Sequence, residues 1–202
     1  MGTEKITYIT PSLYSSVMYW RKREEGDQQE LLDLLDHKPP QTTELMQAGI
    51  DFEDDVRKVC DSEFTYVSED PVANEVASIV NGALWQVPIK TEVQAAGHKI
   101  MIFGRMDCLK RDWIYDIKRV AKYELGKYFE SIQHLSYMKA MQLKQFKYLV
   151  KCGSSLYTET YFWDDNCEQL LQERVGNFIS WIKAIGLYDR YANAWEVGKW
   201  KK

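Results

Sequence analysis

Hydrophobic and polar residues recur along this chain with two different periods, and each period predicts one kind of element. Apolar residues recur at helical spacing in three longer ranges, 11–24, 42–61 and 165–185. Over 113–120 the alternation has a period of two, which is typical of a strand. Two further strands are expected before it, at 85–95 and 98–109. Short turns at 96–97 and 110–112 join the three strands into a meander.

Other ranges complete the predicted order of elements. Shorter helices are expected at 28–36 and 71–82, a long helix with an apolar and aromatic face at 124–150, and a final strand at 154–163. Thr10 or Ser12 can cap the first helix, and Pro71 stands near the start of the helix at 71–82. The helix at 42–61 is expected to bury most of its apolar side chains, Leu45, Ile50, Phe52, Val56 and Val59.

This order predicts an α/β (α+β) fold in which helices cover one central mixed β-sheet. The 202 residues, 45% of them hydrophobic and 28% charged, suit one soluble domain. We expect a core at about 40–185 and an N-terminal helical extension at 1–39. The Trp/Lys-rich tail either packs internally or binds a partner. The chain has neither a run long enough to span a bilayer nor the apolar segment of a signal peptide, so a cytoplasmic protein without a membrane partner is expected.

The net charge of −4 argues against indiscriminate nucleic-acid binding, but the charge is unevenly spread. Basic residues outnumber acidic ones over 118–151, with Lys118, Arg119, Lys122, Lys127, Lys139, Lys144, Lys147 and Lys151 against Glu124 and Glu130. This range either forms a local positive surface for phosphates or is a solvated helix face. The four cysteines form no Cys-x-x-Cys pair, which argues against zinc ribbons and favours free thiols.

Two carboxylates and a lysine gather at the central hairpin. Asp116 and Lys118 are two residues apart and share a face of one strand, and Asp107 reaches this face from the strand before. Hard divalent ions take one or two carboxylates together with water and phosphate oxygens, and a neighbouring lysine can orient water or stabilise developing charge. The group therefore favours a hydrolytic metal site. A surface salt bridge between Asp116 and Lys118 is the plainer alternative.

Two helices add further polar candidates. Glu53 follows Gly49 by one turn, and a glycine there would let another backbone approach closely. Glu53 is therefore either a metal ligand or part of an acidic outer face, and spacing alone favours the outer face. Gln133 and Tyr137 are one turn apart on the same side of a helix. They are either partly buried hydrogen-bonding residues or rim residues that contact a DNA phosphate or hold Lys118.

These residues form four patterns in a fixed order: Gly49-x-x-x-Glu53, Gly104-Arg-Met-Asp107, Asp116-Ile-Lys118 and Gln133-x-x-x-Tyr137. In this order the chain resembles the PD-(D/E)xK nuclease superfamily over about residues 45–140. It is most similar to the RecB-like and phage-exonuclease-like branches, which include CRISPR-associated exonucleases. The resemblance implies a restriction-endonuclease-like core in αβββαβ order.

The resemblance also implies hydrolysis of DNA phosphodiester bonds with Mg²⁺ or Mn²⁺. Asp107 and Asp116 become metal ligands together with the backbone carbonyl of Ile117. Lys118 becomes the catalytic lysine, and Glu53 a further ligand, directly or through water. The enzyme implied is a deoxyribonuclease, most similar to exonucleases.

Gln133 and Tyr137 become the residues that position the substrate or the lysine. The implied partner is DNA, as a linear duplex or a single strand, in phage-type recombination, repair or CRISPR-type processing. The resemblance also allows a homo-oligomer and a recombination or CRISPR partner protein. The cell would be bacterial or phage-infected. The cysteines that flank iron–sulfur members of the superfamily are missing, so no cluster is expected.

Two other functions compete with the nuclease. A nucleic-acid-binding or assembly protein could keep the fold without cutting, but carboxylates that face phosphate repel DNA unless a cation lies between them. An unrelated α/β interaction domain would carry the patterns by coincidence and would hold Asp107, Asp116 and Lys118 apart. Cleavage polarity, strand preference, DNA versus RNA, exonuclease versus endonuclease and oligomeric state stay open at this point.

Overall fold

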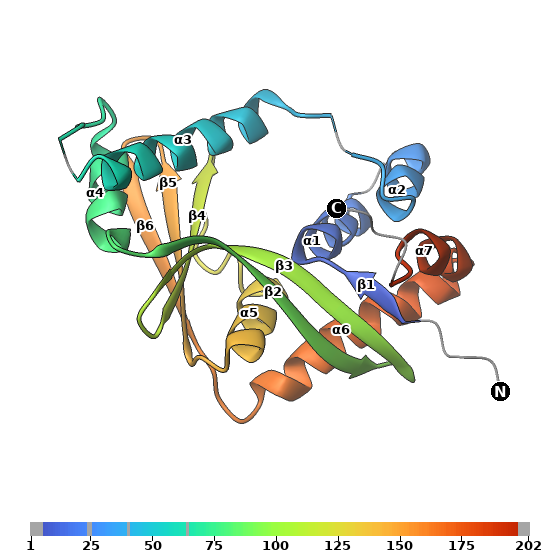
Figure 1. Ribbon diagram of the computed structural model, residues 1–202. Helices are drawn as coiled ribbons and strands as arrows, with labels where there is room; N and C mark the ends of the chain where they lie inside the picture. The colour runs from blue at the N-terminus through green and yellow to red at the C-terminus, as the bar shows by residue number, and fades with distance from the viewer. Residues whose placement is uncertain (1–5, 24–25, 40, 64, 198–202) are drawn as a thin grey trace.

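One mixed β-sheet runs through the computed structural model, which describes residues 6–23, 26–39, 41–63 and 65–197 (Figure 1). Its strands are β1 (Thr7–Ile9), β2 (Leu84–Ala95), β3 (His98–Lys110), β4 (Trp113–Val120), β5 (Gln145–Cys152) and β6 (Ser155–Phe162). The helices are α1 (Pro11–Lys22), α2 (Gln28–Leu35), α3 (Glu44–Asp61), α4 (Pro71–Val80), α5 (Gln133–Met141), α6 (Cys167–Ala184) and α7 (Tyr188–Ala194). The predicted α/β class with a helix-covered mixed sheet is confirmed.

Helix starts follow capping signals in the sequence. The Thr10 hydroxyl accepts a hydrogen bond from the N–H of Leu13 at 3.1 Å, and Thr43 accepts one from Met46 at 3.2 Å. Pro71 opens α4 directly after the capping residue Asp70. These caps satisfy first-turn amides that have no partner within the helix. The five helices expected at 11–24, 28–36, 42–61, 71–82 and 165–185 are confirmed, with ends that shift by at most two residues.

The predicted meander is confirmed as β2, β3 and β4. Ala96 and Gly97 both have positive φ, 50° and 76°, which is the backbone of a tight two-residue hairpin between β2 and β3. Arg111, with a φ of 53°, lies in the second turn. β3 pairs antiparallel with both β2 and β4.

The long helix expected at 124–150 is wrong. α5 begins at Gln133 and ends at Met141, where Gln142 takes a left-handed φ of 55°. Residues 121–131 form turns, and the expected helix is replaced beyond α5 by the strand β5. β5 pairs parallel with β4, so α5 is the crossover that a parallel pair requires. On the face of β5 toward α5, buried residues recur with the strand period, at Phe146, Tyr148 and Val150.

β1 and α7 have no counterpart in the sequence prediction, and they lie side by side. β1 pairs parallel with β3, with Thr7 opposite Ile100. The N–H of Tyr8 donates to the carbonyl of Trp195 at 2.7 Å. Trp195 is buried, and its indole N–H donates to the carbonyl of Leu35 at 3.0 Å. Trp195 therefore packs internally, whereas the end of the tail, residues 198–202, lies outside the described residues.

Helices cover both faces of the sheet (Figure 1). α3 and α4 pack on β4 and β5 around Val56, Val76 and Leu149. α5 lies on the opposite face, where Met138 packs in one cluster with Ile114 of β4. α1 and α6 share a further cluster with β2 and β3. Within the described residues, no helix has both the length and the apolar character needed to cross a bilayer.

The burial expected along α3 holds for its second half and not for its first. Phe52, Val56 and Val59 are buried against the sheet and α4. Leu45 and Ile50 are 58% and 51% exposed, so the expectation that they are buried is wrong. Ile50 is two residues from the buried Phe52 and therefore lies on nearly the opposite side of the helix, whereas Leu45 belongs to the start of α3, which extends past the strands in Figure 1.

The buried His134 predicts a loss of stability in acid. Its ring stacks on that of Tyr161 and meets those of Phe146 and Tyr148 edge-on. Burial, helped by Arg174, lowers the pKa of His134 from 6.5 to about 3. Below about pH 6.5 the unfolded chain takes up a proton that the folded chain refuses. The free energy of unfolding therefore falls as the pH falls, by up to about 1.4 kcal/mol per pH unit.

Urea unfolding at about pH 7 and about pH 5 measures this effect. His134 alone is expected to lower the free energy of unfolding by about 2 kcal/mol over that interval. The variant His134→Phe keeps an aromatic ring and has no titrating group, so it should lack this part of the loss. Equal losses in the two proteins would contradict the prediction.

Candidate active site

The sheet is open at one place along β3. β2 pairs with one edge of β3 from His98 to Leu109. β1 and β4 must therefore share the other edge, where β1 pairs with residues 100–102 and β4 with residues 108–110. Residues 103–107 have no strand partner on that edge in the described chain. Figure 1 shows the result as a fork, with β3 running along β2 while β4 continues beside β5.

A cleft at this fork brings together five residues predicted from the sequence. Asp107 lies just before Cys108, and Asp116 lies just after Tyr115. Because Cys108 and Tyr115 are the last backbone pair of β3 and β4, the two carboxylates face each other where the strands separate. Lys118 lies two residues further along β4, on the same strand face as Asp116. The predicted residues that line the cleft are Asp107, Asp116, Lys118, Gln133 and Tyr137. The alternative of an unrelated interaction domain required Asp107, Asp116 and Lys118 to lie apart, and the structure brings them together.

Asp116 is held by α5 and by Lys118. Its side chain is 1% exposed, and its Oδ1 accepts a hydrogen bond from Gln133 Nε2 at 2.6 Å. The hydroxyl of Tyr148 donates to the amide oxygen of Gln133 at 3.4 Å, which fixes the orientation of that amide. Oδ2 of Asp116 lies 2.5 Å from Lys118 Nζ but has no well-directed hydrogen bond among the described residues. This buried carboxylate oxygen is therefore ion-paired with the lysine of the same strand face.

Asp107 ties the two arms of the fork together. Its Oδ2 accepts the backbone N–H of Ile117 at 2.8 Å, so a side chain replaces a backbone partner where the β3–β4 pairing ends. Burial and the nearby Asp116 carboxylate raise the pKa of Asp107 well above its ordinary value, although Lys118 opposes the shift. Two facing carboxylates, with one ammonium paired to Asp116, leave a negative charge that is poorly compensated.

Lys118 remains an ammonium group in this arrangement. Burial lowers its pKa, but the carboxylates of Asp116 and Asp107 outweigh burial and raise the pKa above the ordinary value for lysine. Its side chain is 33% exposed, so the charged end reaches the cleft. The group can therefore attract an anionic substrate and stabilise negative charge.

The ring of Tyr137 packs directly against the backbone of Gly104. A Cβ placed on Gly104 would lie 2.6 Å from Cε1 and 2.7 Å from the hydroxyl oxygen of Tyr137, closer than atoms pack. Because Gly104 has no side chain, the Tyr137 ring can lie against β3, and its hydroxyl donates to the carbonyl of Arg105 at 3.0 Å. This contact fixes α5, and with it Gln133, relative to the open edge of β3.

Glu53 approaches the fork from α3. Its carboxylate accepts a hydrogen bond from Gln86, which lies opposite Asp107 on β2 and has a φ of 53°. Burial raises the pKa of Glu53, while the hydrogen bond from Gln86 and the charge of Lys118 oppose the rise. Among the described residues, no three His, Cys, Asp or Glu side chains are close enough to hold a metal ion by themselves. Glu53 therefore stays a predicted further ligand beside the pair Asp107–Asp116.

The reason given for Gly49 is wrong. A Cβ placed on Gly49 would meet no atom within 4 Å, so no other backbone approaches this glycine. Gly49 lies in the half of α3 that extends past the sheet. The pattern Gly49-x-x-x-Glu53 is present, but the packing role expected for its glycine belongs to Gly104.

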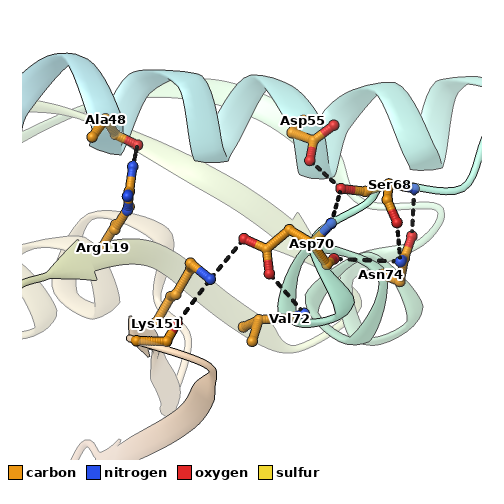
Figure 2. Close-up of polar contacts among 9 residues, drawn as sticks. Ala48, Asp55, Ser68, Asp70, Val72, Asn74, Arg119 and Lys151 are labelled. Atoms are coloured by element: carbon orange, nitrogen blue, oxygen red, sulfur yellow. Dashed lines mark hydrogen bonds and ion pairs between the residues drawn. The ribbon is translucent and has the colours of Figure 1, made fainter.

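Polar contacts on both sides of Glu53 fix α3 against the sheet (Figure 2). On one side Arg119 of β4 donates to the carbonyl of Ala48 at 3.0 Å. On the other side the Ser68 hydroxyl donates to Asp55, and the N–H of Asp70 donates to that hydroxyl at 2.9 Å. Lys151 of β5 completes the chain with an ion pair to Asp70 at 2.7 Å.

The basic residues of 118–151 do not form one helix face, because this range contains a strand, turns, a helix and a second strand. Lys139 pairs with Glu168, and Lys151 pairs with Asp70. Lys147 lies over the ring of Trp113, 4.6 Å from its centroid. Each of these three side chains has a local partner, and the range does not form the single helix face that was one of the two expectations.

Sequence reasoning missed two contributors to the site. Gln86 holds Glu53, but a single left-handed glutamine within a strand leaves no recognisable pattern. Thr10, Pro11 and Ser12, at the start of α1, line the cleft from the far end of the sequence. The capping signal at Thr10 showed that a helix starts here, but not that this start adjoins Lys118.

Comparisons with known proteins establish the class of fold. No protein-family model matches the chain, and no curated protein matches its sequence. Among solved structures, the chain is similar to SSO0001, with a TM-score of 0.50 and 14% identity over 87% of this chain and 77% of that chain. The fold is thus a mixed-sheet α/β fold shared with solved proteins at low sequence identity.

Other solved structures similar to this chain are those of exonucleases. The structure of LHK-Exo in complex with dAMP matches with a TM-score of 0.54 and 15% identity, over 92% of this chain and 93% of that chain. A further structure, the alkaline exonuclease LHK-Exo from Laribacter hongkongensis, covers 93% of each chain at 13% identity with a TM-score of 0.46. This chain therefore has the fold of the LHK-Exo structure bound to dAMP, and at such identities the likeness concerns the fold.

The two glycines of the patterns should respond to alanine in opposite ways. Gly104→Ala forces a methyl group into the ring of Tyr137, which should lower the free energy of unfolding by about 1–3 kcal/mol. Gly49→Ala adds a methyl group in open space on a helix and should raise it by roughly 0.5–1 kcal/mol. Urea unfolding of both variants tests the assignment. Equal effects would contradict the contact between Gly104 and Tyr137.

Proposed function

We propose that this protein is a metal-dependent DNA nuclease of the PD-(D/E)xK superfamily, and that it acts as an exonuclease. The observation that carries the proposal is the facing pair Asp107–Asp116 beside Lys118 in an open fork of the sheet. A protein that only binds DNA gains nothing from two buried carboxylates in its cleft, because they repel phosphate. The similarity in fold to LHK-Exo supports the exonuclease assignment.

The residues at the fork fit a divalent cation. The carboxylates of Asp107 and Asp116 and the backbone carbonyl of Ile117 offer the hard oxygen ligands that Mg²⁺ and Mn²⁺ prefer. Asp116 is buried and ion-paired with Lys118, and burial together with the nearby Asp116 carboxylate raises the pKa of Asp107, so a further cation would relieve the remaining negative charge. When bound, the metal ion supplies charge neutralisation at the phosphate and a more acidic water molecule.

The chain's own side chains supply the rest of the proposed chemistry. The Lys118 ammonium stabilises negative charge that builds on the phosphate oxygens. Gln133 holds the Asp116 carboxylate in its orientation, and Tyr137 holds α5 against β3 so that Gln133 stays in place. Glu53, held by Gln86, adds a further ligand directly or through water. We place this activity in phage-type recombination, repair or CRISPR-type processing, in the cytoplasm of a bacterial or phage-infected cell.

The metal site can be tested without measuring cleavage. Asp107→Asn keeps an oxygen that accepts the N–H of Ile117 and removes the charge opposite Asp116. The pKa of Asp107 is higher in the folded protein than in the unfolded chain. The free energy of unfolding therefore falls as the pH rises from the unfolded-state pKa to the folded-state pKa. At neutral pH without metal, Asp107→Asn should therefore raise the free energy of unfolding by about 1 kcal/mol or more. It should also lose the rise in melting temperature that Mn²⁺ gives the wild type.

The matched control for this variant is Asp112→Asn, which alters an exposed carboxylate in the turn between the same two strands. It should leave both the melting temperature without metal and the response to Mn²⁺ unchanged. Thermal unfolding with Mn²⁺ and with chelator compares the three proteins. A Mn²⁺ response that survives in Asp107→Asn would remove Asp107 from the ligand set.

Cleavage itself requires Asp116 and Lys118. The variants Asp116→Ala and Lys118→Ala are each expected to lower the cleavage rate by about 100-fold or more while DNA binding persists. Linear and covalently closed duplex DNA are incubated with Mg²⁺ or Mn²⁺ and with chelator, and Asp112→Ala serves as the control. Metal-dependent loss of the linear form alone supports an exonuclease, and loss of both forms indicates an endonuclease. Binding without cleavage by the wild type would replace the proposal with a non-cleaving DNA-binding protein.

A further inference from the structure

Gln86 has a backbone conformation that is rare inside a strand. It lies in β2, and its φ of 53° is in the left-handed region, which is unfavourable for a residue that has a Cβ atom. The other non-glycine residues with positive φ in the described ranges stand in turns or directly after helices: His37, Glu63, Ala96, Arg111 and Gln142. Gln86 therefore marks a strained point in the sheet.

The β2–β3 ribbon turns over at this point. Side chains two apart on a strand ordinarily share a face. On β3, however, Cys108 packs with α3 and α4, whereas Met106 packs in the cluster that contains α5. Their partners on β2 divide between the same two clusters. The turnover lies between these two pairs, at the level where Gln86 stands opposite Asp107.

The turnover sets the direction of the Asp107 side chain. A residue at the level where the ribbon changes faces points to neither face, so its side chain can lie toward the neighbouring strand. The Asp107 carboxylate does so, and it accepts the backbone N–H of Ile117 of β4 at 2.8 Å. The backbone of Gln86 is thus linked to the position of a predicted metal ligand.

The same conformation directs the side chain of Gln86 toward α3. Its amide Nε2 donates to the carboxylate of Glu53, and both residues are partly buried. In the ordinary extended conformation the Cα–Cβ bond of Gln86 would leave the strand in another direction, and the amide would no longer meet Glu53. One strained residue therefore contacts one predicted ligand and lies opposite another.

We propose that Gln86 is a positioning residue for the metal ligands, and that its strained backbone is retained because it orients Asp107 and Glu53 together. The inference rests on the proposed nuclease function and adds to it a residue that touches neither the metal ion nor the substrate. Strained residues are concentrated at functional sites, where the surrounding structure holds them in place. Groups that orient metal ligands typically change metal affinity by about 10- to 100-fold.

The strain is tested by comparing Gln86→Ala with Gln86→Gly. Both variants remove the amide, but only glycine adopts the left-handed conformation without cost. In the presence of chelator, Gln86→Gly should melt about 2–4 °C above Gln86→Ala. The matched control is Gln94, an exposed residue of β2 with an ordinary φ, where glycine should melt below alanine. A Gln86→Gly variant that melts at or below Gln86→Ala would show that the backbone is not strained.

The positioning role is tested by the affinity for Mn²⁺, measured by calorimetry without any substrate. Gln86→Ala and Gln86→Gly should each bind Mn²⁺ about tenfold or more weakly than the wild type, because Glu53 loses the donor that orients it. Gln94→Ala removes the same amide from the same strand and should bind Mn²⁺ as the wild type does. A Gln86→Gly variant that is more stable than Gln86→Ala and yet binds Mn²⁺ with wild-type affinity would overturn the proposal.

A double-mutant cycle with Glu53→Gln separates positioning from a general effect on the fold. If Gln86 acts through Glu53, Gln86→Gly should change the Mn²⁺ affinity by less than about twofold once Glu53 is already replaced. An equal loss in both backgrounds would assign Gln86 a purely structural role and overturn the inference, while the proposed nuclease would stand. If the wild type itself binds no Mn²⁺, the nuclease proposal fails. The same cycle measured as melting temperatures in chelator then still decides whether Gln86 holds Glu53, and additive effects there would overturn that contact.

Discussion

The hydrogen bond from the backbone N–H of Ile117 to the Asp107 carboxylate is the contact on which the candidate site depends. It stands where the backbone pairing of β3 and β4 ends, so it marks the place at which the two strands separate. The separation sets Asp107 and Asp116 face to face and leaves room for a cleft between them. A sheet that paired β4 along the whole edge of β3 would fill this space with backbone, and the carboxylates would have no cavity to share.

The electrostatics of the site follow from this geometry. Each carboxylate is placed by a neutral donor, Ile117 for Asp107 and Gln133 for Asp116, and Lys118 supplies a single positive charge. Neutral donors fix orientation without cancelling charge, which keeps the pair attractive for a cation. Tyr137 and Gly104 act one step further away, because their packing sets the position of the helix that carries Gln133.

Most of the fold could be predicted from local signals. Caps at Thr10 and Thr43 and the alternation over 113–120 mark elements whose limits depend on nearby residues alone. β5 could not be told from a helix in the same way, since its polar residues Lys147 and Lys151 are four apart and match a helical face as well. What decides the matter is the parallel pairing with β4, a long-range contact that requires a helix and then a strand.

The candidate site likewise contains residues that local sequence predicts and residues that only tertiary packing brings in. Asp116 and Lys118 were placed correctly on one face by the strand period, and Asp107 by the hairpin. Gln86 and the start of α1 were missed because they reach the fork only through tertiary packing. Gly49 and Gly104 show the limit of reading glycine from sequence: one stands in open space and the other under an aromatic ring, and nothing in the local sequence distinguishes them.

The parallel pairing of β1 has a consequence for how the chain tolerates alteration at its ends. The backbone of β1 is held by the hydrogen bond from Tyr8 to the carbonyl of Trp195. β1 ends at Ile9, and the next three residues, Thr10–Ser12, line the rim of the cleft. A truncation that removed α7 and Trp195 would loosen β1, and that disturbance would reach the rim although the missing residues lie well away from it in sequence. The packing of α7 and Trp195 thus stabilises, through β1, the residues at the entrance of the cleft.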